Sequence, residues 1–190
     1  MQRIKRTFVW LSRIHRCQGF GVQSPSDFRF VREVVNCHRQ YAEYAELDRE
    51  TPNVGGLERK VCRLYFRLAA SLKPATVVNY GESSRSPSSM HMAKGCATAR
   101  MSGSFDDVPQ ADLMRITTGD GAELAYEQAV AKARPGSVLV IEGIKRCGKA
   151  RALWRKAVGD SRTGVTFDLY YVGIVFFDKK RYKENHIVNF

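Results

Sequence analysis

The sequence lacks the paired cysteines and clustered histidines from which metal sites and disulfide frameworks are usually built. It has five cysteines, an odd number, and none of them stands in a CxxC pair. Its four histidines are equally scattered. We therefore expect neither a metal site nor a disulfide framework, and unpaired thiols of this kind suit a reducing compartment, which predicts a cytoplasmic protein.

Long apolar runs are also missing. No run approaches the roughly 18 residues that a membrane-spanning helix needs, so we expect no integral membrane association. The basic stretch 1–16 has too short an apolar part for a signal peptide, Arg13 and Arg16 follow that part, and no small-residue cleavage site appears.

Acidic residues are scarce. Lys and Arg number 31 against 19 Asp and Glu, so the net charge is +12. Such an excess favours an anionic partner, such as nucleic acid, a nucleotide or an acidic membrane, although a merely solvated basic surface is the alternative. With 190 residues, 44% of them hydrophobic, the chain is long enough for one domain with a real core.

The first 56 residues read as a helical extension, followed by an α/β domain over 57–190. Residues 3–14 predict a basic amphipathic helix, because Ile4, Phe8 and Leu11 share one face. We expect this stripe to pack on the body of the protein. An anionic membrane or nucleic acid are the alternatives. Ser24 and the proline after it predict the start of the next helix.

Helices and strands alternate through the rest of the chain. The expected helices are 57–72, 87–93, 121–133 and 150–158, and the expected strands are 76–80, 98–101, 112–117, 137–141 and 186–190. Asp120 and Glu123 have capping-box spacing. Residues 165–178 predict an antiparallel hairpin at a sheet edge, with Gly173 as a place to turn or bulge. This order indicates a mostly parallel sheet with helices on both faces.

The stretch 75–95 suggests a ligand site. An apolar strand runs into Gly81, a loop of small polar residues follows, and Pro87 opens a helix. A strand, a glycine turn and a helix N-terminus in this order suit an anionic or polar ligand. A plain turn without a ligand is the alternative, because nucleotide sites usually carry two or three glycines here.

Several segments resemble a group of small bacterial class I S-adenosylmethionine (SAM)-dependent methyltransferases. Residues 21–28, GVQSPSDF, resemble that group's GVHSPF signature, and the other similar segments are 64–74, 77–81, 140–154 and 166–177. The resemblance implies a Rossmann-like three-layer α/β/α sandwich with an antiparallel C-terminal hairpin, and SAM as the cofactor.

The resemblance also implies which residues would hold the cofactor: Asn79, Gly81, Ser83, Ser84, Arg85 and Thr117. Three of these depart from the family pattern. Asn79 stands where the family has a Glu, Arg85 replaces a second glycine, and Thr117 replaces an acid. The chain is also short between Gly95 and Asp112, with room for one strand and a loop, so the fold is expected to be truncated after the first βα unit.

Two functions follow. An active methyltransferase would use Glu142 and Asp120 as positioning groups or a general base. Their ordinary alternatives are a solvent-exposed strand-end carboxylate and a helix N-cap. The second function is that of a binding protein on a methyltransferase-like fold whose SAM site is weakened or lost. Such a protein would use no cofactor and would bind a phosphate-containing ligand or nucleic acid. Arg85 would serve it, with a basic patch formed by Lys145, Arg146, Lys149, Arg151, Arg155 and Lys156. Trp154 is expected in the core, and the substrate stays open.

Overall fold

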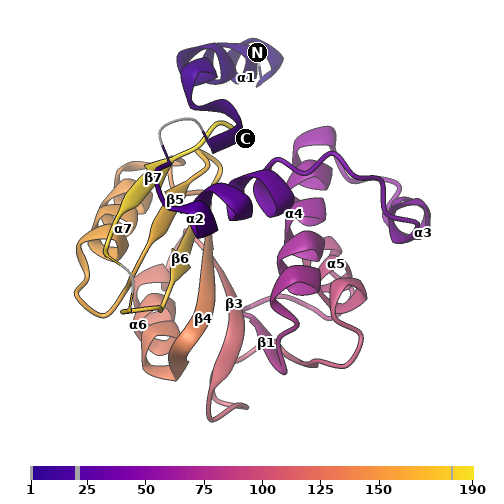
Figure 1. Ribbon diagram of the computed structural model, residues 1–190. Helices are drawn as coiled ribbons and strands as arrows, with labels where there is room; N and C mark the ends of the chain where they lie inside the picture. The colour runs from indigo at the N-terminus through magenta and orange to yellow at the C-terminus, as the bar shows by residue number, and fades with distance from the viewer. Residues whose placement is uncertain (1, 20–21, 181) are drawn as a thin grey trace.

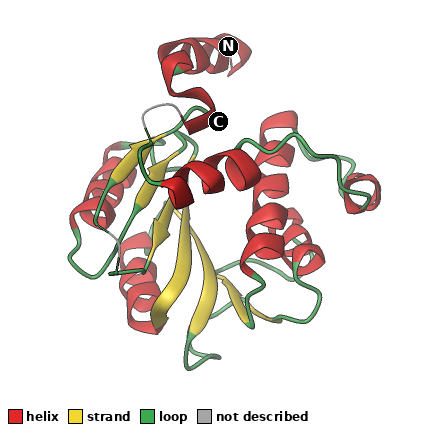
Figure 2. Cartoon of the chain, in the orientation of Figure 1, coloured by secondary structure: helices red, strands yellow, loops and turns green. Residues whose placement is uncertain are grey.

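The computed structural model describes residues 2–19, 22–180 and 182–190, and the side chains at 2–6 and 17–19 are outside the description. Within this part, strands form one sheet between two layers of helices, which confirms the expected α/β/α sandwich (Figures 1 and 2). Gly21, which opens the GVQSPSDF segment, lies outside the described residues.

The helices follow the predicted ranges to within a few residues. They are α1 (Gln2–Ser12), η1 (Ile14–Gly19), α2 (Pro25–Phe30), the π-helix η2 (Val31–Val35), α3 (Glu43–Glu50), α4 (Gly56–Leu72), α5 (Pro87–Gly95), α6 (Ala122–Lys132) and α7 (Gly148–Gly159). The strands are β1 (Thr76–Asn79), β2 (Arg100–Ser102), β3 (Ala111–Thr117), β4 (Ala133–Glu142), β5 (Thr166–Asp168), β6 (Val172–Phe176) and β7 (Asn185–Ile187). The division at residue 56 stays a prediction.

The sheet has the order β2-β1-β3-β4-β6-β5-β7. Strands β2, β1, β3 and β4 are parallel neighbours, whereas β6 is antiparallel to both β4 and β5. The chain passes from β1 to β2 on one side and then returns to β3 on the other side of β1. The strand order therefore reverses between β1 and β3, and ligands of open α/β sheets bind outside the carboxyl ends of the strands at such a point.

Each face of the sheet carries its own hydrophobic core. Side chains from η2, α4 and α5 cover one face, with Leu64 and Leu68 of α4 fully buried. Side chains from α6 and α7 cover the other face, including Trp154 at 3% exposure, which confirms its expected core position. The spacing that predicted α4 is the spacing that places its apolar stripe against the sheet.

One predicted helix cap is correct and one is wrong. Ser24 Oγ accepts from the Asp27 N–H at 3.4 Å, as expected for the cap of α2. At α6, however, the N-cap is Gly121 with a φ of 76°, and no side chain caps this end. Because the chain enters the helix through a left-handed glycine, Asp120 is turned to solvent rather than into a capping box.

The predicted C-terminal hairpin is present, but Gly173 is not its turn. The chain turns between β5 and β6 through Tyr170, which has a φ of 72°. Gly173 lies inside β6, opposite Ile141 of β4. A Cβ at this position would overlap the indole ring of Trp154, 2.6 Å from its Cε3, so the glycine makes room for Trp154. The hairpin is also not at the edge, because β7 lies outside β5.

The expectation that the stripe of α1 packs on the body is wrong. Phe8 is 69% exposed and Leu11 is 50% exposed, while the side chain of Ile4 is outside the description. The physical reason is Arg13, whose Nη1 lies 3.0 Å from Oδ1 of the buried Asp168 and holds the opposite side of the segment to the body. Figure 1 shows α1 beyond the end of the sheet, near the C-terminus.

None of the helices in the described part of the chain has the length and apolar character that crossing a bilayer requires.

The packing of Trp154 against β6 gives a stability prediction. Gly173→Ala is expected to lower the free energy of unfolding by about 1–3 kcal/mol, because the added methyl group overlaps the indole ring. The matched control is Gly159→Ala at the end of α7, where an added Cβ meets nothing within 4 Å, and a change within about 0.5 kcal/mol is expected. Urea denaturation measures both, and equal losses would contradict the proposed role of Gly173.

Candidate functional site

The candidate site lies where the strand order reverses, at the carboxyl ends of β1 and β3. Asn79 is the last residue of β1 and pairs in register with Arg115 of β3. Glu142 ends β4 and pairs with Thr117. Arg115 and Glu142 follow the alternation of Leu113 and Val140, so they face the α4 side of the sheet.

The side-chain amide of Asn79 is buried and hydrogen-bonded through both its oxygen and its nitrogen. The residue is 1% exposed, and its Oδ1 accepts from Arg115 Nη1 at 2.9 Å. Its Nδ2 donates to the hydroxyls of Ser88 and Ser89 in α5, at 2.9 and 2.7 Å. An asparagine amide has two N–H donors, so both are used.

Arg115 carries a buried positive charge at the centre of the site. Its side chain is 5% exposed, and its Nε and Nη2 donate to Glu142 Oε2 at 3.0 and 2.6 Å. Nη1 also reaches Glu82 Oε1 at 3.4 Å. Burial by itself lowers the pKa of Arg115, but the facing oxygens of Tyr65 and Glu142 outweigh burial and hold that pKa above its ordinary value. The guanidinium therefore stays charged.

Tyr65 of α4 completes the cluster. Its hydroxyl donates to Glu142 Oε2 at 2.6 Å, and its ring centroid lies 5.5 Å from Cζ of Arg115. Complete burial, followed by the nearby Glu142, raises the pKa of Tyr65 well above its usual value. The phenol is thus a fixed hydrogen-bond donor, and one carboxylate oxygen of Glu142 accepts from both Tyr65 and Arg115.

The loop after β1 is closed on itself and on the segment after β2. Gly81, with a φ of 73°, donates its N–H to the carbonyl of Gly103 at 3.0 Å, and the ring of Tyr80 stacks on that of Phe105 at 5.2 Å. The loop residues whose N–H groups donate within the protein are Tyr80, Gly81, Glu82, Arg85 and Ser86. These groups are the ones that a loop of this kind offers to an anion.

The structure separates the site residues expected from sequence into three groups. Asn79 and Glu142 meet through Arg115, and Thr117 lies beside Glu142 in the sheet. The exposed residues of the loop are Gly81, Ser83, Ser84 and Arg85. Asp120 is exposed and lines a different hollow of about 650 Å³, between the N-terminal ends of α6 and α7, whose described lining does not include Glu142.

Sequence reasoning missed Arg115, Tyr65 and Glu82. A lone arginine inside the apolar strand ADLMRIT was the available signal, because a buried charge in such a strand needs a partner. Arg85, which stands where the family has a second glycine, is exposed, and the arginine that lies between the strand ends is Arg115.

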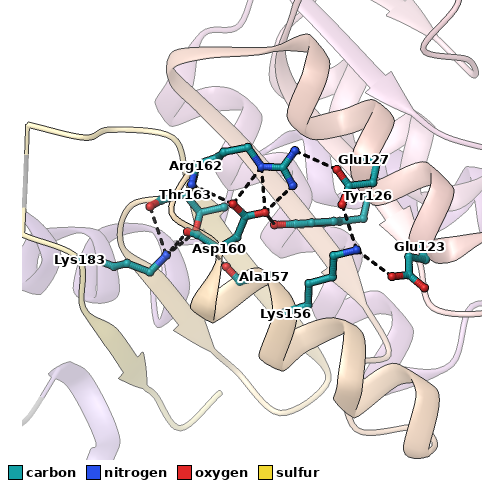
Figure 3. Close-up of polar contacts among 9 residues, drawn as sticks. All are labelled: Glu123, Tyr126, Glu127, Lys156, Ala157, Asp160, Arg162, Thr163 and Lys183. Carbon is teal, nitrogen blue, oxygen red and sulfur yellow. Dashed lines mark hydrogen bonds and ion pairs between the residues drawn. The ribbon is translucent and has the colours of Figure 1, made fainter.

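Part of the expected basic patch is neutralised by acids. Lys145 Nζ lies 2.6 Å from Asp168 Oδ2. Lys156 Nζ lies 2.7 Å from Glu123 and 3.0 Å from Glu127, in a network between α6 and α7 that also includes Asp160 (Figure 3). The first pair joins the turn after β4 to β5 and the others join α7 to α6, and all of them reduce the positive charge that the patch presents.

A second basic surface lies between α4 and the segment 36–40. It surrounds a hollow of about 280 Å³ whose basic lining residues are His38, Arg39, Arg59, Lys60, Arg63 and Arg67. Among the lining residues in the described structure there is no acid, although Asp48 nearby pairs with Arg59 at 3.2 Å and Arg63 at 2.8 Å. A phosphate-bearing ligand suits a hollow of this charge.

One group of metal-type ligand atoms joins α2 to β7. Asp27 Oδ2 and Glu184 Oε2 lie 3.5 and 3.3 Å from Nε2 of His186, and the three ligand atoms are within 4.8 Å of one another. Nothing in the sequence indicated this group, because Asp27 lies far along the chain from Glu184 and His186.

The cluster around Arg115 predicts an asymmetry between two variants. Glu142→Gln is expected to lower the free energy of unfolding by about 3 kcal/mol, because it leaves a 5%-exposed cation with only the more distant carboxylate of Glu82. Arg115→Met is expected to cost about 1 kcal/mol, because the carboxylate that remains is 28% exposed and can be hydrated.

Urea denaturation of both variants measures this difference. The control is Glu123→Gln, which breaks a surface pair and should change stability by at most about 0.5 kcal/mol. A larger loss of stability for Arg115→Met than for Glu142→Gln would contradict this account, because it would show that leaving Glu142 unpaired costs more than leaving Arg115 unpaired.

Comparison with known proteins places the fold. No family model matches the chain, and no curated protein matches it in sequence. The crystal structure of cofactor-bound Rv0187 from MTB aligns with a TM-score of 0.53 and 14% identity, over 82% of this chain and 99% of that one. The SAH-bound Podospora anserina methyltransferase PaMTH1 aligns with a TM-score of 0.52 and 10% identity, over 83% and 97%. The chain has the class I SAM methyltransferase fold.

Proposed function

We propose that this chain is a SAM-dependent methyltransferase-like protein whose cofactor site is weakened or lost. The observation that carries the proposal is the set of bonds around Arg115. Asn79, which the family resemblance places at the cofactor, is bonded to this arginine and to Ser88 of α5, and Oε2 of Glu142, the expected catalytic acid, accepts from the same arginine.

The charge of SAM adds to this argument. SAM carries a cationic sulfonium and a cationic ammonium group, so its site needs acidic oxygens that are free to face it. Arg115 already neutralises Glu142 and approaches Glu82. A ligand cation at the strand ends would have to compete with a guanidinium that is held in place by burial and four protein hydrogen bonds.

The loop after β1 supports the same conclusion. Gly103 and Phe105 pack against Gly81 and Tyr80, in the loop to which the resemblance assigns the cofactor. Opening this contact for a nucleoside would break the Gly81 hydrogen bond and expose Phe105, which is completely buried. Both changes would reduce the net free energy of binding.

Calorimetric titration tests the proposal directly. SAM and its demethylated product SAH are expected to bind the purified chain with a Kd no tighter than about 1 mM, which corresponds to about −4 kcal/mol. A cooperative thermal melt of the same sample shows that the protein is folded. Saturable binding with a Kd near 1 µM, about −8 kcal/mol, would overturn the proposal.

The basic hollow favours a second candidate function, which is the binding of an anionic partner. Arg39 is exposed and lines this hollow, and Arg67 is buried beside it with three of its nitrogens donating to Val34, Val35 and Tyr44. Nucleic acid is the partner that the notable excess of positive charge suits best.

A short single-stranded oligonucleotide tests the second candidate. Binding is expected at low salt, and Arg39→Ala should reduce the slope of log K against log salt by about 0.7, because one phosphate contact is lost. Arg155→Ala on the exposed side of α7 is the control and should leave the slope unchanged. Equal effects of the two variants would indicate nonspecific attraction, and no binding at low salt would exclude the candidate.

A further inference from the structure

We propose that the segment Gln2–Ile14 docks the protein on an anionic lipid surface. Large apolar side chains of this segment are open to solvent: Phe8 is 69% exposed, Leu11 50%, Ile14 49% and Trp10 47%. Side chains of this size are usually covered in a soluble protein, and a group of them on one short segment marks an interaction site. This inference does not depend on whether SAM binds.

The body holds the helix so that the apolar side points outward. Phe8 and Leu11 are three residues apart and share one face of α1. Arg13 lies on the other side and donates to the carboxylate and the carbonyl of Asp168, at 3.0 and 3.1 Å. On that side, the carbonyl of Trp10 also accepts from Asn189 Nδ2 at 3.2 Å. The attachment thus leaves the apolar face free to enter another phase.

Burial of Asp168 strengthens this attachment. The carboxylate side chain is 4% exposed and lies between Arg13 and Lys145. Burial would raise its pKa, but the hydrogen bond from Lys145 and the charge of Arg13 together hold the pKa below its ordinary value. The ion pair is therefore formed throughout the neutral range.

The positive charge of the segment favours an anionic surface as its partner. Residues 1–16 contain five basic residues and no acid in the sequence: Arg3, Lys5, Arg6, Arg13 and Arg16. A helical segment that is rich in Lys and Arg and also carries large apolar side chains is typical of helices that lie in the interface of a bilayer. Basic residues next to the surface add attraction to anionic headgroups.

Other occupants fit less well. A second copy of this chain would bring a segment with the same excess of positive charge against itself. Nucleic acid would satisfy the charge but would offer no apolar phase to Phe8 and Leu11. An anionic bilayer satisfies both features. With 11 residues, α1 is about 16 Å long, so it lies along the surface and does not cross it.

Vesicle binding of the full chain tests the proposal. The protein is expected to sediment with vesicles that contain phosphatidylglycerol and to stay in solution with pure phosphatidylcholine vesicles. Trp10 should report docking by a blue shift of fluorescence, because it is 47% exposed, whereas the other tryptophan, Trp154, is 3% exposed and already in an apolar environment.

Matched variants identify the segment responsible. Leu11→Glu is expected to weaken vesicle binding about tenfold or more, because it replaces a side chain that enters the apolar phase with a charged one. Leu124→Glu on α6, where Leu124 is 63% exposed, should bind like the unchanged protein. Thermal melts of both variants confirm that they are folded.

Several results would overturn the proposal. They are failure to sediment with anionic vesicles at low salt, equal binding to neutral vesicles, and equal losses for the Leu11 and Leu124 variants. Self-association of the free protein that disappears in Leu11→Glu, without vesicle binding, would assign the face to a second copy. An oligonucleotide shift that Leu11→Glu abolishes, again without vesicle binding, would assign it to nucleic acid.

Discussion

One buried positive charge constrains the centre of this molecule. Arg115 stands on a strand whose neighbours are apolar and at a point where only 5% of its side chain meets solvent. A charge in that position has to be paired and hydrogen-bonded, because leaving it unpaired costs several kcal/mol. The carboxylate of Glu142, the amide of Asn79 and the face of Tyr65 meet this requirement. These groups lie near the carboxyl ends of the parallel strands, where open α/β sheets bind their ligands, so a ligand at this point would have to compete with these bonds.

The sequence predicted most of the fold, because the signals for its elements are local. The spacing of leucines in 57–72, the apolar run 137–141 and the serine before Pro25 each depend on neighbours within a few residues. The cluster around Arg115 could not be predicted in the same way, since its partners come from α4, β1, the loop after β1 and β4. Spacing also missed that a left-handed Gly121, rather than Asp120, precedes α6.

The N-terminal segment shows the same limit. Its periodicity predicted a helix with an apolar stripe, and the helix is present. The ion pair between Arg13 and Asp168 decides which side of α1 faces the body. These two residues lie near opposite ends of the chain, so the local pattern of residues 3–14 could not predict their pairing. The resulting arrangement presents Phe8 and Leu11 outward, while Asn79 and Glu142 at the strand ends are bonded to Arg115. We therefore expect the protein to bind its partners through its exposed surface, including the segment Gln2–Ile14, more than through the carboxyl ends of β1 and β3.

The central claim is that Arg115 is held by the protein and is not available to a ligand, and nitrogen-15 spectra of the arginine side chains test it most directly. We expect a slowly exchanging Nε–H signal at neutral pH that disappears in Arg115→Lys, since Nε donates to Glu142 at 3.0 Å and the site is buried. Addition of excess SAH should leave the signal in place. Rapid exchange of Arg115 Nε–H with water, or a saturable shift of its signal with SAH, would contradict the account.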